Sequence, residues 1–164
     1  MTEALIITGS NMGNRKAYLT KAIEGLRDAA VFTTELSPLY ETEPWGDIPQ
    51  QNYYNQALIV KTKLSANLLL AAMLHVEQQL GRERGEQQYG PRTIDIDLLL
   101  YSTQIIQSPT LSIPHPRMHL RRFVLVPACR IAPNWIHPVF QKTLFQLLKE
   151  CTDNGKVELV LNNS

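Results

Sequence analysis

The chain has 164 residues, of which 44% are hydrophobic and 19% are charged, and these proportions are typical of a single globular domain. Its formal net charge of +1 argues against a dedicated nucleic-acid-binding protein, and no apolar run approaches the roughly 18 residues of a membrane span. The first residues lack a secretory signal, and Cys129 and Cys151 lack CxxC spacing. We therefore expect one domain over residues 1–164, with reduced thiols, in the cytoplasm, and with neither a membrane nor a nucleic acid as partner.

The predicted elements begin with four strands and two helices in the order βαββαβ. Runs of apolar and β-branched residues predict strands at 4–8, 31–40, 53–62 and 93–101. Apolar residues at helical spacing predict a helix capped by Asn11 or Asn14 after the first strand, and a second from Ser65 to Gly81. This order is typical of a ferredoxin-like α+β fold with an antiparallel sheet.

The remaining elements are predicted as an elaboration of that core. Gly9-Ser10-Asn11 predicts a plain turn, because it has neither Walker A nor GxGxxG spacing. After the fourth strand we expect a C-terminal helical and hairpin extension. It consists of a hairpin arm near 104–106, a loop over 108–116, helices over 121–131 and 143–151, and a small edge strand at 157–161.

Two aspartates interrupt the last of the four strands. Side chains alternate faces along a strand, so Asp95 and Asp97 project from one face, roughly 6–7 Å apart. Carboxylates in an apolar run repel each other and are costly unless a cation compensates them. A hard divalent metal would do so, and Arg92 lies close enough to face an anion that the metal holds. The alternative is that both carboxylates face water from an edge strand.

Charge is distributed unevenly along the chain. Residues 98–149 have six basic side chains and no acidic one, whereas acidic residues are plentiful before them. A carboxylate-rich part facing a cation-rich part would suit a metal–polyphosphate ligand, and a solvated basic surface explains the charge alone equally well. Arg82 and Arg84 could reach a triphosphate through their guanidinium groups, or pair with Glu83 and Glu86 at the surface.

Two further side chains are candidates for the same site. Glu77 lies two helical turns before Arg84, and it could bind a base or sugar, orient an arginine, or be solvated at the helix end. His115 stands between two prolines near Arg117 and Arg121, and it could contact a phosphate or be a loop histidine with no role.

An aromatic and amide set suggests a second subsite. Trp45 lies on the loop 44–52, Tyr53 and Asn55 share one face of the third strand, and Phe123 lies in a predicted helix. A flat heterocycle would use aromatic faces for stacking and an amide for paired hydrogen bonds. Taken singly, each aromatic is more often part of a core.

Six motifs then occur in one order: Gly9-Ser10-Asn11, Tyr40-Glu41-Thr42-Glu43-Pro44-Trp45-Gly46, Tyr53-Tyr54-Asn55, Gly81-Arg82-Glu83-Arg84, Gly90-Pro91-Arg92-Thr93-Ile94-Asp95-Ile96-Asp97 and Pro114-His115. Their order and spacing resemble those of the 6-hydroxymethyl-7,8-dihydropterin pyrophosphokinases of the folate pathway, over residues 5 to 145. The fifth motif is highly specific to that family.

The resemblance implies a ferredoxin-like monomer that transfers the terminal pyrophosphate of ATP to the hydroxymethyl group of the pterin and releases AMP. It implies two Mg²⁺ ions held by Asp95 and Asp97, with catalytic roles for Arg82, Arg92, Asp95 and Asp97. It implies that ATP is bound by Glu77, Arg84, Tyr89, Arg92, Leu98, Ser112, His115 and Arg121. It implies that the pterin is bound by Thr42, Pro44, Trp45, Tyr53, Asn55 and Phe123.

The sequence departs from the family pattern at four positions. Gln88 replaces a basic residue or Asp, Tyr89 replaces a Trp of some members, and Leu74 and Thr110 replace polar or basic nucleotide contacts of some members. These changes bear on ATP affinity and on closure of the loop 82–91 more than on the chemistry.

Two other classes of protein share the βαββαβ order. An RNA-recognition domain stacks bases on aromatics of its first and third strands, but residues 4–8 and 56–62 contain no aromatic. A regulatory ligand-binding domain of the same fold would not need the aspartate pair.

Overall fold

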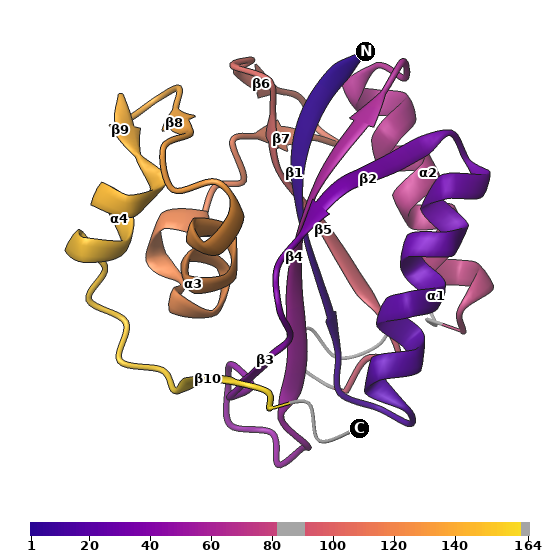
Figure 1. Cartoon of the computed structure of the whole chain (residues 1–164), viewed down its shortest axis with the longest axis vertical. Helices are drawn as coiled ribbons and strands as arrows, with labels where there is room; N and C mark the ends of the chain where they lie inside the picture. The colour runs from indigo at the N-terminus through magenta and orange to yellow at the C-terminus, as the bar shows by residue number, and fades with distance from the viewer. Residues whose placement is uncertain (82–90, 162–164) are drawn as a thin grey trace.

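A computed structural model describes residues 1–81 and 91–161 of the chain (Figure 1). The elements of the first part are β1 (Thr2–Ser10), α1 (Arg15–Asp28), β2 (Val31–Leu36), β3 (Tyr40–Thr42), β4 (Tyr53–Thr62) and α2 (Ala66–Gln79). Those of the second part are β5 (Asp95–Tyr101), β6 (Ile106–Gln107), β7 (Ser112–Ile113), a 3₁₀ turn (Met118–Leu120), α3 (Arg122–Ile131), β8 (Ile136–His137), β9 (Lys142–Thr143), α4 (Leu144–Glu150) and β10 (Val157–Leu159).

The main sheet is antiparallel and has the order β10-β3-β4-β1-β5, with β2 also paired to β4. The first and third strands of the predicted order, β1 and β4, therefore lie in the middle, and β5 lies at one edge. This is the arrangement expected of a βαββαβ chain, and the predicted ferredoxin-like α+β fold is confirmed.

Helices cover both faces of this sheet (Figure 1). Side chains alternate along β1, so Ala4 and Ile6 pack with α1 and α2, whereas Leu5 and Ile7 pack with α3 and α4. Because β1 is buried on both sides from Ala4 onward, it reads in the sequence as a continuous apolar run.

The helices begin at the kinds of residue that cap a helix. Asn14, not Asn11, caps α1, since its side chain accepts a 3.0 Å hydrogen bond from the backbone N–H of Ala17. Ser65 caps α2 as predicted, and Gly81 follows that helix with φ of +91°, a conformation that favours glycine.

Several predicted boundaries differ from those of the structure. The expected strand over 31–40 is divided into β2 and β3, because Pro38 has no N–H to contribute to the ladder. Gly9 and Ser10 belong to β1 rather than to a turn, and they pair with Asn55 and Tyr54. The hairpin expected near 104–106 is formed slightly later, by β6 with β7.

The C-terminal extension consists of α3, α4, two small hairpins and the edge strand β10. Within the described parts of the chain, none of the helices combines the length and apolar character that a membrane crossing requires.

Candidate functional site

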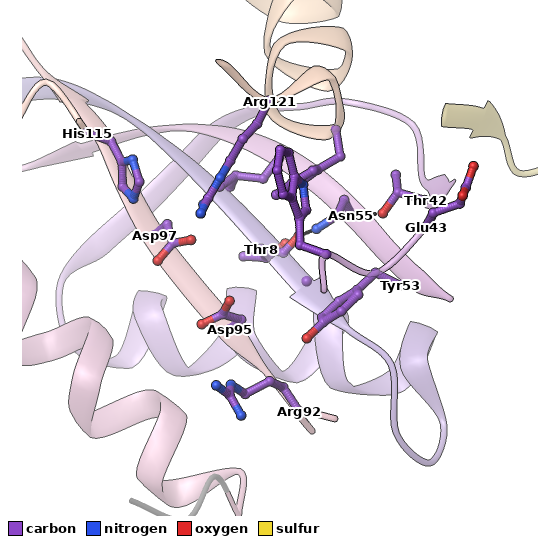
Figure 2. A pocket seen from close by; sticks show the side chains of 14 residues that line it. Thr8, Thr42, Glu43, Tyr53, Asn55, Arg92, Asp95, Asp97, His115 and Arg121 are labelled. Atoms are coloured by element: carbon purple, nitrogen blue, oxygen red, sulfur yellow. Dashed lines mark hydrogen bonds between the residues drawn. The ribbon is translucent and has the colours of Figure 1, made fainter. Parts of the chain in front are cut away.

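A cavity of about 240 Å³ lies over the sheet face that carries α3 (Figure 2). Its walls come from β1, β3, β4, β5, the start of α3 and nearby loops. The residues lining it are Ile7, Thr8, Gly9, Thr42, Glu43, Trp45, Tyr53, Asn55, Arg92, Asp95, Asp97, His115, Arg121 and Phe123.

The two aspartates lie side by side on β5. Figure 2 shows Asp95 and Asp97 projecting from the strand toward the cavity, as alternation along the strand predicts. Ile96, between them, is buried on the opposite face. The strand β5 lies at the edge of the sheet, as the alternative expected, but both aspartates are partly buried and line the cavity.

Basic and neutral donors surround these carboxylates. Arg92 lies just before Asp95 and is only 6% exposed. Arg121 reaches toward the cavity from the start of α3, and His115 lies beside Asp97 (Figure 2). The structure therefore brings together the acidic strand and cations from both halves of the chain, the pattern that suits an anion held through a metal.

His115 is a neutral donor at pH 7. Burial, with the nearby charges of Arg121 and Arg117, lowers its pKa to about 4. Its Nδ1 accepts a 3.1 Å hydrogen bond from the backbone N–H of Arg117, which assigns the ring proton to Nε2. Its own backbone N–H donates to the carbonyl of Leu99 at 2.9 Å and so fixes the residue against β5.

The amide of Asn55 is held at the centre of the site. Its Nδ2 donates to the carbonyl oxygen of Thr8 at 3.1 Å, and its Oδ1 accepts from the hydroxyl of Thr42 at 2.5 Å. An amide has two N–H groups and an oxygen with two lone pairs, so this oriented side chain can also bond the edge of a planar ligand.

Two aromatic rings and one guanidinium group form the opposite wall. The ring centroids of Trp45 and Phe123 lie 6.3 Å apart in an edge-to-face arrangement. The guanidinium carbon of Arg121 lies 5.7 Å from the Trp45 ring centroid and 5.6 Å from that of Phe123. Arg121 therefore contacts the aromatic subsite while it lines the same cavity as the aspartates.

Gly9 was not predicted as a site residue. It pairs with Asn55 on one side and with Asp95 on the other, between the two subsites. A Cβ atom there would lie 2.6 Å from Asn55 Nδ2 and 3.2 Å from Tyr53 Cδ1. Its place in the Gly9-Ser10-Asn11 motif was the only signal in the sequence. Ile7 and Thr8 also line the cavity and belong to no pattern that marks them, and Glu43 lines it from within the motif of residues 40–46.

Asn11, buried just after β1, is hydrogen-bonded to two separate loops. Its Nδ2 donates at 2.8 Å both to Gln50 Oε1 and to the carbonyl of Gln51. Its Oδ1 accepts from the backbone N–H of Arg92 at 2.7 Å, and its own N–H donates to the Arg92 carbonyl at 3.0 Å. Asn11 thus ties the loop that carries Trp45 to Arg92, three residues before the aspartate strand.

Several residues expected in the site do not line this cavity. Pro44 lines a second cavity, Ser112 lies half-buried in β7, and the Leu98 side chain packs in the core beside α1 and α2, so a nucleotide could meet only its backbone. Glu77 is 3% exposed and accepts a hydrogen bond from the Ile96 N–H, so solvation at the helix end is wrong. The predicted positions Arg82, Arg84 and Tyr89 lie outside the described residues.

Comparison with known proteins gives consistent matches. A 2-amino-4-hydroxy-6-hydroxymethyldihydropteridine pyrophosphokinase of Aquifex aeolicus is 40% identical over 144 residues, which cover 88% of this chain and 89% of the relative. The Bacillus subtilis protein of the same name is 43% identical over 129 residues, covering 78% and 77%.

A solved structure, the Plasmodium falciparum HPPK-DHPS A437G protein with SDX-DHP, matches with a TM-score of 0.73 and 16% identity. The match covers 91% of this chain but 45% of that one, and at this identity it shows the fold alone. The family model described as 7,8-dihydro-6-hydroxymethylpterin-pyrophosphokinase (HPPK) matches residues 5–133. This chain therefore belongs to the 7,8-dihydro-6-hydroxymethylpterin-pyrophosphokinase family.

Proposed function

We propose that this protein transfers the terminal pyrophosphate of ATP to the hydroxymethyl group of 6-hydroxymethyl-7,8-dihydropterin in folate biosynthesis, giving the pterin diphosphate and AMP. Its membership of the pyrophosphokinase family supports this activity. The observation that carries the proposal is one cavity that joins a carboxylate pair and basic side chains to an aromatic and amide subsite. A polyphosphate and a flat heterocycle could lie side by side there.

The donor set of the cavity fits magnesium. Mg²⁺ is usually bound by one or two carboxylates together with water and substrate phosphates. Asp95 and Asp97 supply two carboxylates. Among the described residues, no group of three or more His, Cys, Asp or Glu could hold a metal ion by itself, so the substrate phosphates would supply the other ligands. We infer that the pair holds two Mg²⁺ ions together with the triphosphate. Magnesium there would offset the negative charge on the phosphate oxygens.

The remaining cavity residues would position the triphosphate and the acceptor hydroxyl. Arg92 and Arg121 would hold phosphate oxygens through planar guanidinium groups, and neutral His115 would donate from Nε2–H without adding charge. We extend the family's nucleotide roles to Glu77, Leu98 and Ser112, and also to Arg82, Arg84 and Tyr89, which lie outside the described residues.

The aromatic and amide subsite would bind the pterin. Asn55, held by Thr8 and Thr42, would pair with the polar edge of the heterocycle, and Trp45 and Phe123 would pack against its faces. Tyr53 and Pro44 would complete this subsite. Binding both substrates in one cavity excludes water, which would otherwise compete with the hydroxyl as acceptor. We also propose that the protein acts as a monomer in the cytoplasm.

Product analysis tests this function. The protein is incubated with ATP and 6-hydroxymethyl-7,8-dihydropterin, with Mg²⁺ or with excess chelator, and the phosphorus species are resolved by ³¹P NMR. We expect AMP and pterin diphosphate in equal amounts, formed only with the metal. Formation of ADP and a pterin monophosphate would contradict pyrophosphate transfer, and equal rates in chelator would contradict the metal requirement.

A further inference from the structure

We propose that Asp153, in the segment between α4 and β10, is a positioning residue for the pterin subsite. Its carboxylate holds the N-terminus of α3, which places Arg121 and Phe123 against Trp45. The identity of the ligand rests on the function proposed above, whereas the positioning itself does not. The family model matches residues 5–133 and so does not include this segment.

The first support is the way in which α3 begins. The first N–H groups of a helix have no partner within the helix, and Arg121, at the N-cap position, makes no side-chain capping bond. Asp153, which lies outside the helix, supplies the missing capping bond, because its Oδ2 accepts a 2.9 Å hydrogen bond from the backbone N–H of Arg122. Its Oδ1 accepts from the N–H of Gly155 at 2.9 Å, which fixes the carboxylate. A negative charge at a helix N-terminus is also favourable.

The second support is the attachment of the same segment to the opposite side of the subsite. The backbone N–H of Lys156 donates to Glu43 Oε1 at 2.9 Å. Immediately afterwards β10 pairs with β3, with Val157 opposite Thr42, and Figure 1 shows the chain running from α4 past α3 to this strand. The segment therefore connects the start of α3, which carries Phe123, to the strand that carries Thr42.

The third support is the open space behind the aromatic wall. A second cavity, of about 190 Å³, is lined by Trp45, Phe123 and Glu43, which also line the first, and by Asp153. Trp45 and Phe123 thus separate two cavities. Each ring has open space on both sides, so close packing alone does not fix its position. Their 6.3 Å edge-to-face contact therefore depends on where the backbone of α3 begins. Asp153 holds that backbone.

The test compares three substitutions of Asp153 in a Trp135→Phe background, which leaves Trp45 as the one tryptophan. Asp153→Ala removes the carboxylate, Asp153→Glu keeps its charge but displaces it, and Asp153→Asn keeps an oxygen acceptor at the same reach. We expect the KM for the pterin to rise roughly tenfold in Asp153→Ala and Asp153→Glu, with kcat at saturation within about threefold. Asp153→Asn should raise the KM less than either, because its one amide oxygen can still accept from the Arg122 N–H although it cannot also accept from Gly155.

A second measurement needs no substrate. The emission of Trp45 in the ligand-free protein should shift in Asp153→Ala and Asp153→Glu, because its contacts with Phe123 and Arg121 change, and should shift less in Asp153→Asn. Thr143→Ala is the matched control. It removes the side-chain cap of the neighbouring helix α4, so it should lower thermal stability without changing the pterin KM or the Trp45 emission.

Unchanged emission and unchanged pterin KM in both Asp153→Ala and Asp153→Glu would overturn the proposal. So would variants that lose only stability, as Thr143→Ala does. If Asp153→Ala does not fold, Asp153→Glu against Asp153→Asn decides in the same way. Absence of any pyrophosphate transfer by the unsubstituted protein would contradict the proposed function, and the emission of Trp45 would still decide whether Asp153 positions the aromatic wall.

Discussion

The carboxylate of Glu77 accepts a 2.7 Å hydrogen bond from the backbone N–H of Ile96, the residue between Asp95 and Asp97. Glu77 extends from α2, on the sheet face opposite the cavity, and among the described residues β5 has no partner strand along its outer edge. The bond therefore holds the aspartate strand from behind. It gives Glu77 a structural role in addition to any contact with a nucleotide.

Replacement of Glu77 should destabilise the protein. Glu77→Ala leaves the buried N–H of Ile96 without this acceptor, and we expect a loss of about 2 kcal/mol in the free energy of unfolding, measured by urea denaturation without ligands. Glu77→Gln keeps an oxygen that can accept the bond, so it should lose about half as much. If the alanine variant unfolds at the same urea concentration as the unsubstituted protein, the support for β5 does not come from this bond.

A methyl group at Gly9 should weaken pterin binding selectively. Its Cβ would lie 2.6 Å from Asn55 Nδ2 and 3.2 Å from the Tyr53 ring, so Gly9→Ala must displace the amide that we assign to the heterocycle. We expect the KM for the pterin to rise roughly tenfold while the KM for ATP changes little. Gly25→Ala is the matched control. Its Cβ would be crowded against Val76, which does not line the cavity, so both KM values should stay unchanged. An equal rise for both substrates would contradict the assignment of Asn55.

The neutral state of His115 should make stability depend on pH. Its pKa falls from 6.5 to about 4 on folding, so the unfolded chain takes up the proton first as pH decreases. The stability contributed by the neutral ring is therefore complete above about pH 6.5 and is lost as pH falls toward 4. Burial and His119 lower the pKa of His137 as well, which acts in the same direction.

His115→Asn isolates the contribution of His115, because its Oδ1 can accept the same Arg117 N–H and does not titrate. The Tm of the ligand-free protein, measured without metal by circular dichroism between pH 7.5 and 4.5, should fall less steeply in this variant. Parallel curves for the two proteins would show that His115 is not held neutral by the fold.

How far the sequence predicts the structure depends on the range of the contacts. The order βαββαβ is visible because alternation along strands and caps such as Asn14 are local. Alternation along a strand also predicts that Asp95 and Asp97 share one face, and both line the cavity. The role of Asn11 was missed, because its partners lie about 40 and 81 residues away and its residue type equally suits a cap. The division of the strand at Pro38 follows from a local property of the sequence, because proline has no N–H for the ladder.

The position of Glu77 shows the same limit from the other direction. The sequence predicts the helix that carries Glu77, and it predicts for the carboxylate a contact with a nucleotide, with an arginine or with water. Only the packing of α2 against β5 brings its carboxylate to the Ile96 N–H, and no local pattern records that packing. The cavity residue Ile7 likewise looks like any core residue in the sequence.

We propose that Asp95 and Asp97 together hold the magnesium ions used in pyrophosphate transfer. The most direct test is the initial rate of AMP formation by Asp95→Asn and Asp97→Asn at saturating ATP, pterin and Mg²⁺, with urea denaturation to show that both variants are folded. Each substitution removes a charged oxygen ligand while it preserves shape, so we predict that each lowers the rate by at least about a hundredfold. Full activity in either folded variant would contradict the claim.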